Sequence, residues 1–170
     1  MLNLIQELVK KGLLEKDQAI SLEYELRTSG KREEELILER KIVSEDFLFE
    51  LKSKLLKIPL KKVDPDDIAI SALEMIPEES ARYYYFIPLK KEEKFVEIGM
   101  VYPEDIKAQE ALNFLAHNQK FSYQVSLITL TNFKSLLKKY RNLKGEVSKA
   151  LEELETEMKA ERIEQKITPI

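Results

Sequence analysis

The sequence predicts an α+β protein with an N-terminal helical subdomain, a small α/β sandwich and a C-terminal linker helix. Through the first sixty residues, apolar positions recur at three- and four-residue spacing, which is typical of short amphipathic helices. From Ile58 onward, prolines separate shorter elements, and β-branched and aromatic residues become common, as in strands alternating with helices. Between Gly145 and Pro169 there is no proline, and a narrow apolar stripe among many charges predicts one amphipathic helix.

The helical subdomain covers residues 1–57 and contains three clear helix boundaries. Gly12 and Gly30 are expected to end helices, because glycine readily takes the left-handed conformation found at a helix C-terminus. Ser44 is expected to cap the start of the next helix, with acidic residues in its first turn. Residues 8–17 and 37–46 repeat one pattern with a period of 29 residues. Since one helix-hinge-helix unit cannot enclose a core alone, we expect the two copies to pack face to face.

The sandwich covers residues 58–142 and is predicted to follow the order β-α-β-β-α-β-α. An extended segment at residues 60–63 precedes a short helix at 67–73 and a second helix opened by Pro77. Two strands joined by a charged turn, a helix, a third strand and a closing helix follow, at 85–90, 95–101, 103–115, 121–128 and 131–141. This order predicts helices packed on a small mixed sheet. The residue before Pro59 is biased away from helix, so we expect a hinge between the two subdomains there.

The linker helix covers residues 143–170, and Gly145 is expected to give it a flexible exit from the sandwich. Its apolar residues fall at alternating four- and three-residue steps, at Val147, Leu151, Leu154 and Met158. This stripe is too narrow for a helix buried on all sides. We therefore expect the helix to project, or to pair with a second copy, rather than to fold back on the sandwich.

Composition excludes several classes of protein. The 28 basic and 31 acidic residues are spread along the chain and give a net charge of -3, so we expect no nucleic-acid partner. Without cysteine there is no disulfide framework and no thiolate metal site, which fits a cytoplasmic protein. The N-terminus does not resemble a signal peptide, and no apolar stretch reaches the roughly 18 residues of a membrane span. Contact with a membrane is therefore expected to be peripheral, through a protein partner or an amphipathic face.

No catalytic or metal site is expected. The chain lacks a GxxxxGK[ST] phosphate loop, and residues 29–32 have neither the leading glycine nor the hydroxyl after lysine. His117, the single histidine, is interpreted as a turn residue because no cysteine or carboxylate cluster accompanies it. The aspartates around Pro65 are interpreted as turn and cap residues. The aromatic run 83–86 is interpreted as core packing at a helix-strand junction, with a partner-binding hot spot as the alternative.

An ordered set of motifs in the sandwich resembles a known family. The runs are MIPEESARY at 75–83, IPL at 87–89, VEIGMVYPED at 96–105 and LNFL at 112–115. In order and spacing, this set resembles the N-terminal domain of the ATPases of type II secretion and type IV pilus assembly. The helical repeat is similar to the helical module of that family. The resemblance implies that the chain is a fragment whose residues 167–170 lead toward a motor domain.

The resemblance also implies a function. It indicates a regulatory and docking domain that binds an inner-membrane platform component, or a cytoplasmic adaptor, of a protein transport machine and couples it to the motor. The fragment itself would then not be an enzyme, whereas the parent would be a hexameric ATPase that uses ATP and Mg in its motor. Such a chain would be cytoplasmic and peripheral to the inner membrane. Two alternatives stay open: a cyclic-dinucleotide sensor that alters motor activity, and a stand-alone scaffold.

Arg32 is the one candidate ligand-binding residue. Some members of the family bind cyclic di-GMP through a duplicated helical motif, and Arg32 falls on the arginine position of the second copy. A guanidinium there suits a phosphate or a guanine edge. Other motif positions are altered, at Asn3, Glu33, Glu34, Lys41 and Leu55. Because two carboxylates beside the arginine would repel phosphates, we expect no cyclic di-GMP and no other cofactor in this fragment, and we interpret Arg32 as a solvated helix residue.

Overall fold

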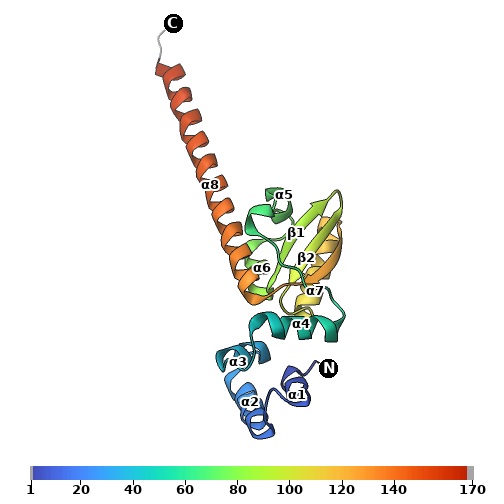
Figure 1. Cartoon of the computed structure of the whole chain (residues 1–170). Helices are drawn as coiled ribbons and strands as arrows, with labels where there is room; N and C mark the ends of the chain where they lie inside the picture. Colours follow the sequence, from blue (N-terminus) through green and yellow to red (C-terminus); the bar gives the residue numbers. More distant parts are fainter. Residues whose placement is uncertain (1, 168–170) are drawn as a thin grey trace.

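The computed structural model describes the backbone of residues 2–167, and the side chains of these residues other than Val147 and 163–167. Four helices come first: α1 (Leu4–Lys10), α2 (Lys16–Ser29), α3 (Glu33–Glu39) and α4 (Glu45–Leu56). Then follow the 3-10 helix η1 (Pro65–Asp67), α5 (Ile70–Leu73), α6 (Glu78–Tyr84), β1 (Phe86–Glu92), β2 (Phe95–Met100), α7 (Ile106–Gln119), β3 (Ser122–Leu127) and α8 (Leu130–Ile167). The predicted α+β fold is confirmed, with a helical module ahead of a small sheet (Figure 1).

The helical module, α1 to α4, consists of two helix pairs that are built alike. α3 begins 29 residues after α1, and α4 begins 29 residues after α2. The first helix of each pair is followed by a residue of positive φ, Gly12 at 75° and Lys41 at 53°. In both copies the next amide, that of Leu13 or Ile42, donates to a carbonyl five residues earlier. This is the Schellman arrangement, which satisfies carbonyls left free at a helix end.

The predicted helix boundaries in this module are confirmed. Gly30 ends α2 in the left-handed conformation, with φ at 68°. The hydroxyl of Ser44 accepts a hydrogen bond from the amide of Phe47 at 3.2 Å and so caps α4. Local turn chemistry therefore accounts for where these helices begin and end.

The sheet is mixed and has three strands in the order β1-β2-β3. β1 and β2 form an antiparallel hairpin, whereas β2 and β3 run parallel and are connected through α7 (Figure 1). Leu60 makes a single parallel bridge to Leu127, so the predicted extended segment at residues 60–63 lies beside β3 at the edge of the sheet. The strands begin and end within two residues of their expected positions.

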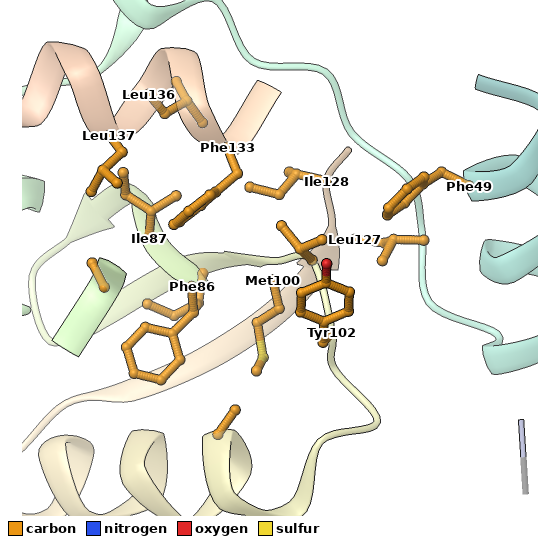
Figure 2. Close-up of a cluster of buried hydrophobic side chains, with 14 of the residues drawn as sticks. Phe49, Phe86, Ile87, Met100, Tyr102, Leu127, Ile128, Phe133, Leu136 and Leu137 are labelled. Atoms are coloured by element: carbon orange, nitrogen blue, oxygen red, sulfur yellow. The ribbon is translucent and has the colours of Figure 1, made fainter. Parts of the chain in front are cut away.

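Helices cover both faces of the sheet. The first turns of α8 lie on one face and α7 lies on the other (Figure 2). The side chains that α8 buries against the sheet and its neighbours are Phe133, Leu136, Leu137 and Tyr140. The Tyr140 hydroxyl donates to the carbonyl of Ile76, and burial raises the pKa of Tyr140 to about 12. These contacts fix the start of α8 in the body of the protein.

The buried side chains of the helical module and the sandwich form one continuous cluster. Figure 2 shows Phe49 of α4 pointing toward the end of the sheet where Leu127 and Tyr102 lie. This continuity argues against the hinge expected near Pro59, because separating the modules would expose Phe49 to water. The division of the chain at residues 57 and 142 stays a prediction.

Two helices in the sandwich differ from expectation. α7 continues to Gln119 and ends only at Lys120, where φ is 57°. His117 therefore lies exposed in the last turn of α7, so its interpretation as a turn residue was wrong; the segment contains no proline or glycine to stop the helix earlier. The short helix expected at 67–73 is divided into η1 and α5, because Ile68 between them is extended.

α8 is one continuous helix of 38 residues, so the flexible exit expected at Gly145 is wrong. A single glycine inside a helix costs only about 1 kcal/mol relative to alanine, which is too little to break it. Leu143 is the last described apolar residue of α8 that packs against the core, and the C-terminal part of the helix projects away from the body of the protein (Figure 1). Its stripe is half exposed at Leu151, Leu154 and Met158, while the side chain of Val147 and the residues 168–170 lie outside the described part. Within residues 2–167, no helix combines the length and apolar character that crossing a membrane requires.

Candidate functional site

Several charged side chains of the helical module contact the sandwich at one place, which we call the junction cluster. It consists of Arg32, Glu34, Lys52, Tyr102, Glu104 and Asp105. Arg32 is the N-cap residue of α3, Glu34 lies in α3 and Lys52 in α4, and the last three come from the loop that leads from β2 into α7. The sequence-predicted site residue, Arg32, is therefore part of the contact between the two modules.

Lys52 lies at the centre of the junction cluster and is fully buried. Its Nζ donates to the carbonyl oxygen of Val101 at 2.8 Å. Carboxylate oxygens of Glu104 and Glu34 lie 2.8 Å and 3.4 Å from the same nitrogen. A buried ammonium group is tolerated only when it is paired and hydrogen-bonded in this way, so Lys52 ties α3 and α4 to the β2–α7 loop. The second carboxylate oxygen of Glu104, Oε2, is buried without a hydrogen-bond partner.

Arg32 joins the modules on the outer side of Lys52. Its guanidinium lies 2.9 Å from the Asp105 carboxylate and 3.7 Å from the centre of the Tyr102 ring. Burial opposes the charge of both partners, but their mutual hydrogen bond prevails, so the pKa of Arg32 is raised and that of Asp105 is lowered. Asp105 also accepts from the amides of Lys107 and Ala108 and so caps α7. The interpretation of Arg32 as a solvated helix residue was therefore wrong.

Glu33 and Glu34, the two carboxylates beside Arg32 in the sequence, each have another partner. The carboxylate of Glu33, in the second copy of the repeat, accepts a hydrogen bond from the amide of Ile5 at 2.8 Å. This satisfies a free amide in the first turn of α1, which belongs to the first copy. Burial raises the pKa of Glu33, although the backbone amides at the start of α1 oppose this. Glu34 points to Lys52 instead. Both carboxylates are therefore engaged by other groups, although the charge of Glu34 also contributes to raising the pKa of Arg32.

Aromatic contacts link the junction cluster to α8. The Tyr85 ring lies 5.2 Å from the Tyr102 ring and 5.3 Å from the Phe133 ring, measured between centroids. Burial, and then the nearby Glu34 charge, raise the pKa of Tyr102 well above its usual range, so it stays neutral. Tyr85 packs in the core as expected for the aromatic run, whereas Tyr83 is exposed.

The remaining candidates have structural roles. Asp64 caps η1, and Asp66 forms an ion pair with Lys139. Among the described residues, no group of three or more acidic, histidine or cysteine side chains is placed to bind a metal ion. The junction cluster pairs its charges with one another and contains no nucleophile beside a base. Its charged and hydrogen-bonding groups hold the two modules together.

The sequence profile of the MshEN domain matches residues 56–147, which is more than half of the chain. The chain belongs to the MshEN domain family. This confirms the resemblance to the N-terminal domains of type II secretion and type IV pilus ATPases that the motifs of the sandwich indicated. The match of the MshEN domain begins after most of α4, so Arg32 lies outside it.

Two solved structures are similar in fold to this MshEN chain along nearly all of their own length. One is described as the structure of MshE with cdg; it is 20% identical, with a TM-score of 0.67, and the alignment covers 82% of this chain and 99% of that one. The other is the N-terminal domain of XpsE, 14% identical, with a TM-score of 0.58 and coverage of 80% and 92%. No curated protein sequence matches significantly. The ligand of the MshE structure leaves the expectation against cyclic di-GMP without support.

Sequence reasoning identified Arg32 but missed Lys52. One signal was present, because Lys52 occupies a position where the apolar face of α4 should continue, beside Leu48, Phe49 and Leu51. A lysine at such a position predicts a buried partner, but the periodicity does not say which carboxylate provides it. Glu104 lies 52 residues further along the chain, too far for a local rule to pair them.

Proposed function

We propose that this chain is the N-terminal regulatory and docking region of a secretion or pilus assembly ATPase. It would bind the cytoplasmic part of an inner-membrane platform component and couple that contact to the motor. The match to the MshEN domain supports the proposal that the chain is part of such an ATPase. The docking role is supported by the junction cluster and the continuous core, which give a partner one firm body to bind. The chain would be cytoplasmic and reach the membrane through that partner.

The fragment is proposed to have no catalytic activity of its own. No phosphate loop is present in its sequence, and the ion pairs of the junction cluster leave no free acid-base pair there. ATP hydrolysis would belong to a motor domain in the parent protein. Purified chain should show no ATP turnover above that of a boiled sample, and turnover abolished by Lys52→Met would contradict the proposal.

Docking is tested by binding to the soluble cytoplasmic fragments of the inner-membrane platform proteins encoded near this chain. Biolayer interferometry with the full chain should give saturable one-to-one binding to one of these fragments. Lys52→Met, which loosens the junction, should weaken that binding, whereas the exposed Lys54→Met should not. Absence of binding to every fragment would refute the docking role.

A cyclic-dinucleotide sensor is the second candidate, and the surroundings of Arg32 favour it. The guanidinium is partly exposed at the module junction, and both neighbouring glutamates are engaged elsewhere. A phosphate would compete with Asp105 for this guanidinium, because a guanidinium can donate paired hydrogen bonds to two oxygens of either a carboxylate or a phosphate. The fold neighbour MshE, whose structure includes cdg, makes cyclic di-GMP the ligand to try first.

Calorimetric titration of the chain with cyclic di-GMP separates the two candidates. A sensor should bind saturably, and Arg32→Ala should abolish the heat while the exposed Arg27→Ala retains it. No heat at millimolar ligand would exclude the sensor and leave the docking proposal unchanged.

A further inference from the structure

Residues 60–63 form an outer edge of the sheet that is paired on one side only. The amide of Lys61 donates to the carbonyl of Leu127 at 2.8 Å, and the amide of Leu127 donates to the carbonyl of Pro59 at 2.8 Å. Further along, the side chain of Asn132 accepts from the amide of Val63 at 3.0 Å and donates to its carbonyl at 2.8 Å. The amide of Lys61 and both main-chain groups of Val63 are therefore paired with β3 and α8.

The alternating groups of the same segment point the other way. In an extended chain, successive peptide groups face opposite sides, so the N–H and C=O groups of Leu60 and Lys62 face away from β3. None of these four groups forms a hydrogen bond with any residue that the structure describes. They form a short open strand edge, which is a ready template for another strand.

A surface hollow of about 810 Å³ runs along this edge. The N-terminus of α4 and the start of α8 form its walls, and the acidic residues Glu45, Asp46 and Asp64 line it. Of the two lysines, Lys61 is neutralised by Glu97, and Lys62 is the single basic residue without an ion pair among the residues lining the hollow. The hollow therefore carries a net negative charge.

We propose that this edge binds an extended, basic peptide segment of the platform partner as an added β-strand. The main-chain groups of Leu60 and Lys62 would pair with the incoming strand, and Glu45, Asp46 and Asp64 would attract its basic side chains. This inference rests on the proposed docking function and names its surface. A second copy of the same edge fits less well, because pairing would bring the lysines at 61 and 62 of both copies together.

Two substitutions at one position test the edge. Lys62→Pro removes the outward-facing N–H, and its ring blocks an incoming strand, while an edge strand tolerates proline. Lys62→Ala removes the same charge but keeps the N–H. Both variants should melt within about 2 °C of wild type, because the side chain of Lys62 is exposed.

Binding to the cytoplasmic fragment of the platform protein is measured for each variant. Lys62→Pro should bind about tenfold or more weakly, and Lys62→Ala should bind like wild type or slightly better. Equal binding by the wild type and both variants would overturn the proposal that the partner pairs with this edge, while leaving the docking function intact. Equal loss in both variants would also overturn it, because the lysine charge would then be the determinant. Failure of the wild type to bind would refute the docking function itself.

Hydrogen exchange gives a readout that does not depend on the folding of a variant. In the wild type with the fragment added, the amides of Leu60 and Lys62 should exchange at least about tenfold more slowly than in the free chain. Binding should also weaken as salt rises from 50 to about 300 mM, because acidic and basic groups meet. Binding without protection of these two amides would place the partner elsewhere.

Discussion

Replacing Lys52 with methionine is expected to loosen the junction between the two modules. Methionine keeps much of the volume of the lysine stem, but it leaves the Val101 carbonyl without its donor and the Glu34 carboxylate, 6% exposed, without its counter-charge. Removing one partner of a buried ion pair costs about 3–5 kcal/mol, because the remaining charge stays out of water. We expect a loss of about 4 kcal/mol in the free energy of unfolding, a large part of the about 5–15 kcal/mol typical of a domain.

Urea unfolding at pH 7, followed by circular dichroism, measures this loss. Lys54→Met on the same helix is the matched control, because Lys54 is exposed, and it should change the free energy by less than about 0.5 kcal/mol. Adding Glu34→Gln to Lys52→Met removes the more buried of the two stranded carboxylates, Glu34 and Glu104, and should restore about 1–2 kcal/mol.

A loss below about 1 kcal/mol for Lys52→Met, with no recovery on adding Glu34→Gln, would refute this reasoning. The lysine would then not be the buried partner that the structure places at the junction. Two separate unfolding transitions in the wild type would also contradict the single continuous core, which predicts one cooperative unit.

Three further changes test other features. Asp105→Asn keeps a capping oxygen but removes the charge, and should lower the free energy of unfolding by about 1 kcal/mol at pH 7. Because the folded-state pKa of Asp105 is lowered, this loss should be present in full above pH 3.8 and disappear as the pH falls through that lowered pKa. Replacing Leu151 and Leu154, which are 56% and 51% exposed, with serine should leave the melting temperature within about 1 °C and reduce any self-association seen by light scattering. Lys41→Gly should raise the free energy of unfolding by about 0.5–1 kcal/mol in urea titrations, because the lysine holds a positive φ that Gly12 holds without strain.

Each of these has an outcome that would contradict it. A cost of Asp105→Asn that persists unchanged down to pH 2 would mean that the carboxylate is not charge-paired. A melting temperature lowered by more than about 5 °C in the double leucine variant would mean that the far half of α8 packs on the body. A loss of stability in Lys41→Gly would mean that the lysine side chain contributes more than its backbone costs.

Local chemistry explains which parts of the fold were predictable. Gly30 and Ser44 mark helix ends through their own backbone and side-chain preferences, and such effects can be read from a few neighbouring residues. The strands were found because β-branched and aromatic residues, and the prolines that separate the elements, are also local signals. Gly145 misled the prediction, since a glycine permits a break but does not force one when the flanking residues favour helix.

Long-range pairing explains what was missed. Arg32 was singled out through the repeat, but nothing local indicates that Asp105, 73 residues away, would take its charge. Likewise, Glu33 was expected to lie beside Arg32 and repel phosphates, and instead it accepts from an amide at the start of α1 in the other copy of the repeat. The packing of α3 against α1 decides where these side chains point, and it follows from the whole core rather than from any motif.

The uninterrupted course of α8 makes it a lever. The helix would pivot about its buried first turns, which contain Phe133 and Tyr140. The Tyr85 ring packs between Phe133 and Tyr102, and so connects these turns to the junction of the modules. At 1.5 Å per residue, the arm from Leu143 to Ile167 is about 36 Å long. A tilt of about 10° at this pivot would swing the far end through about 6 Å, roughly one helical turn. Sub-ångström shifts beside Arg32 would thus be amplified into movements of several ångströms at the far end of α8, enough to shift a segment packed against it by about one helical turn.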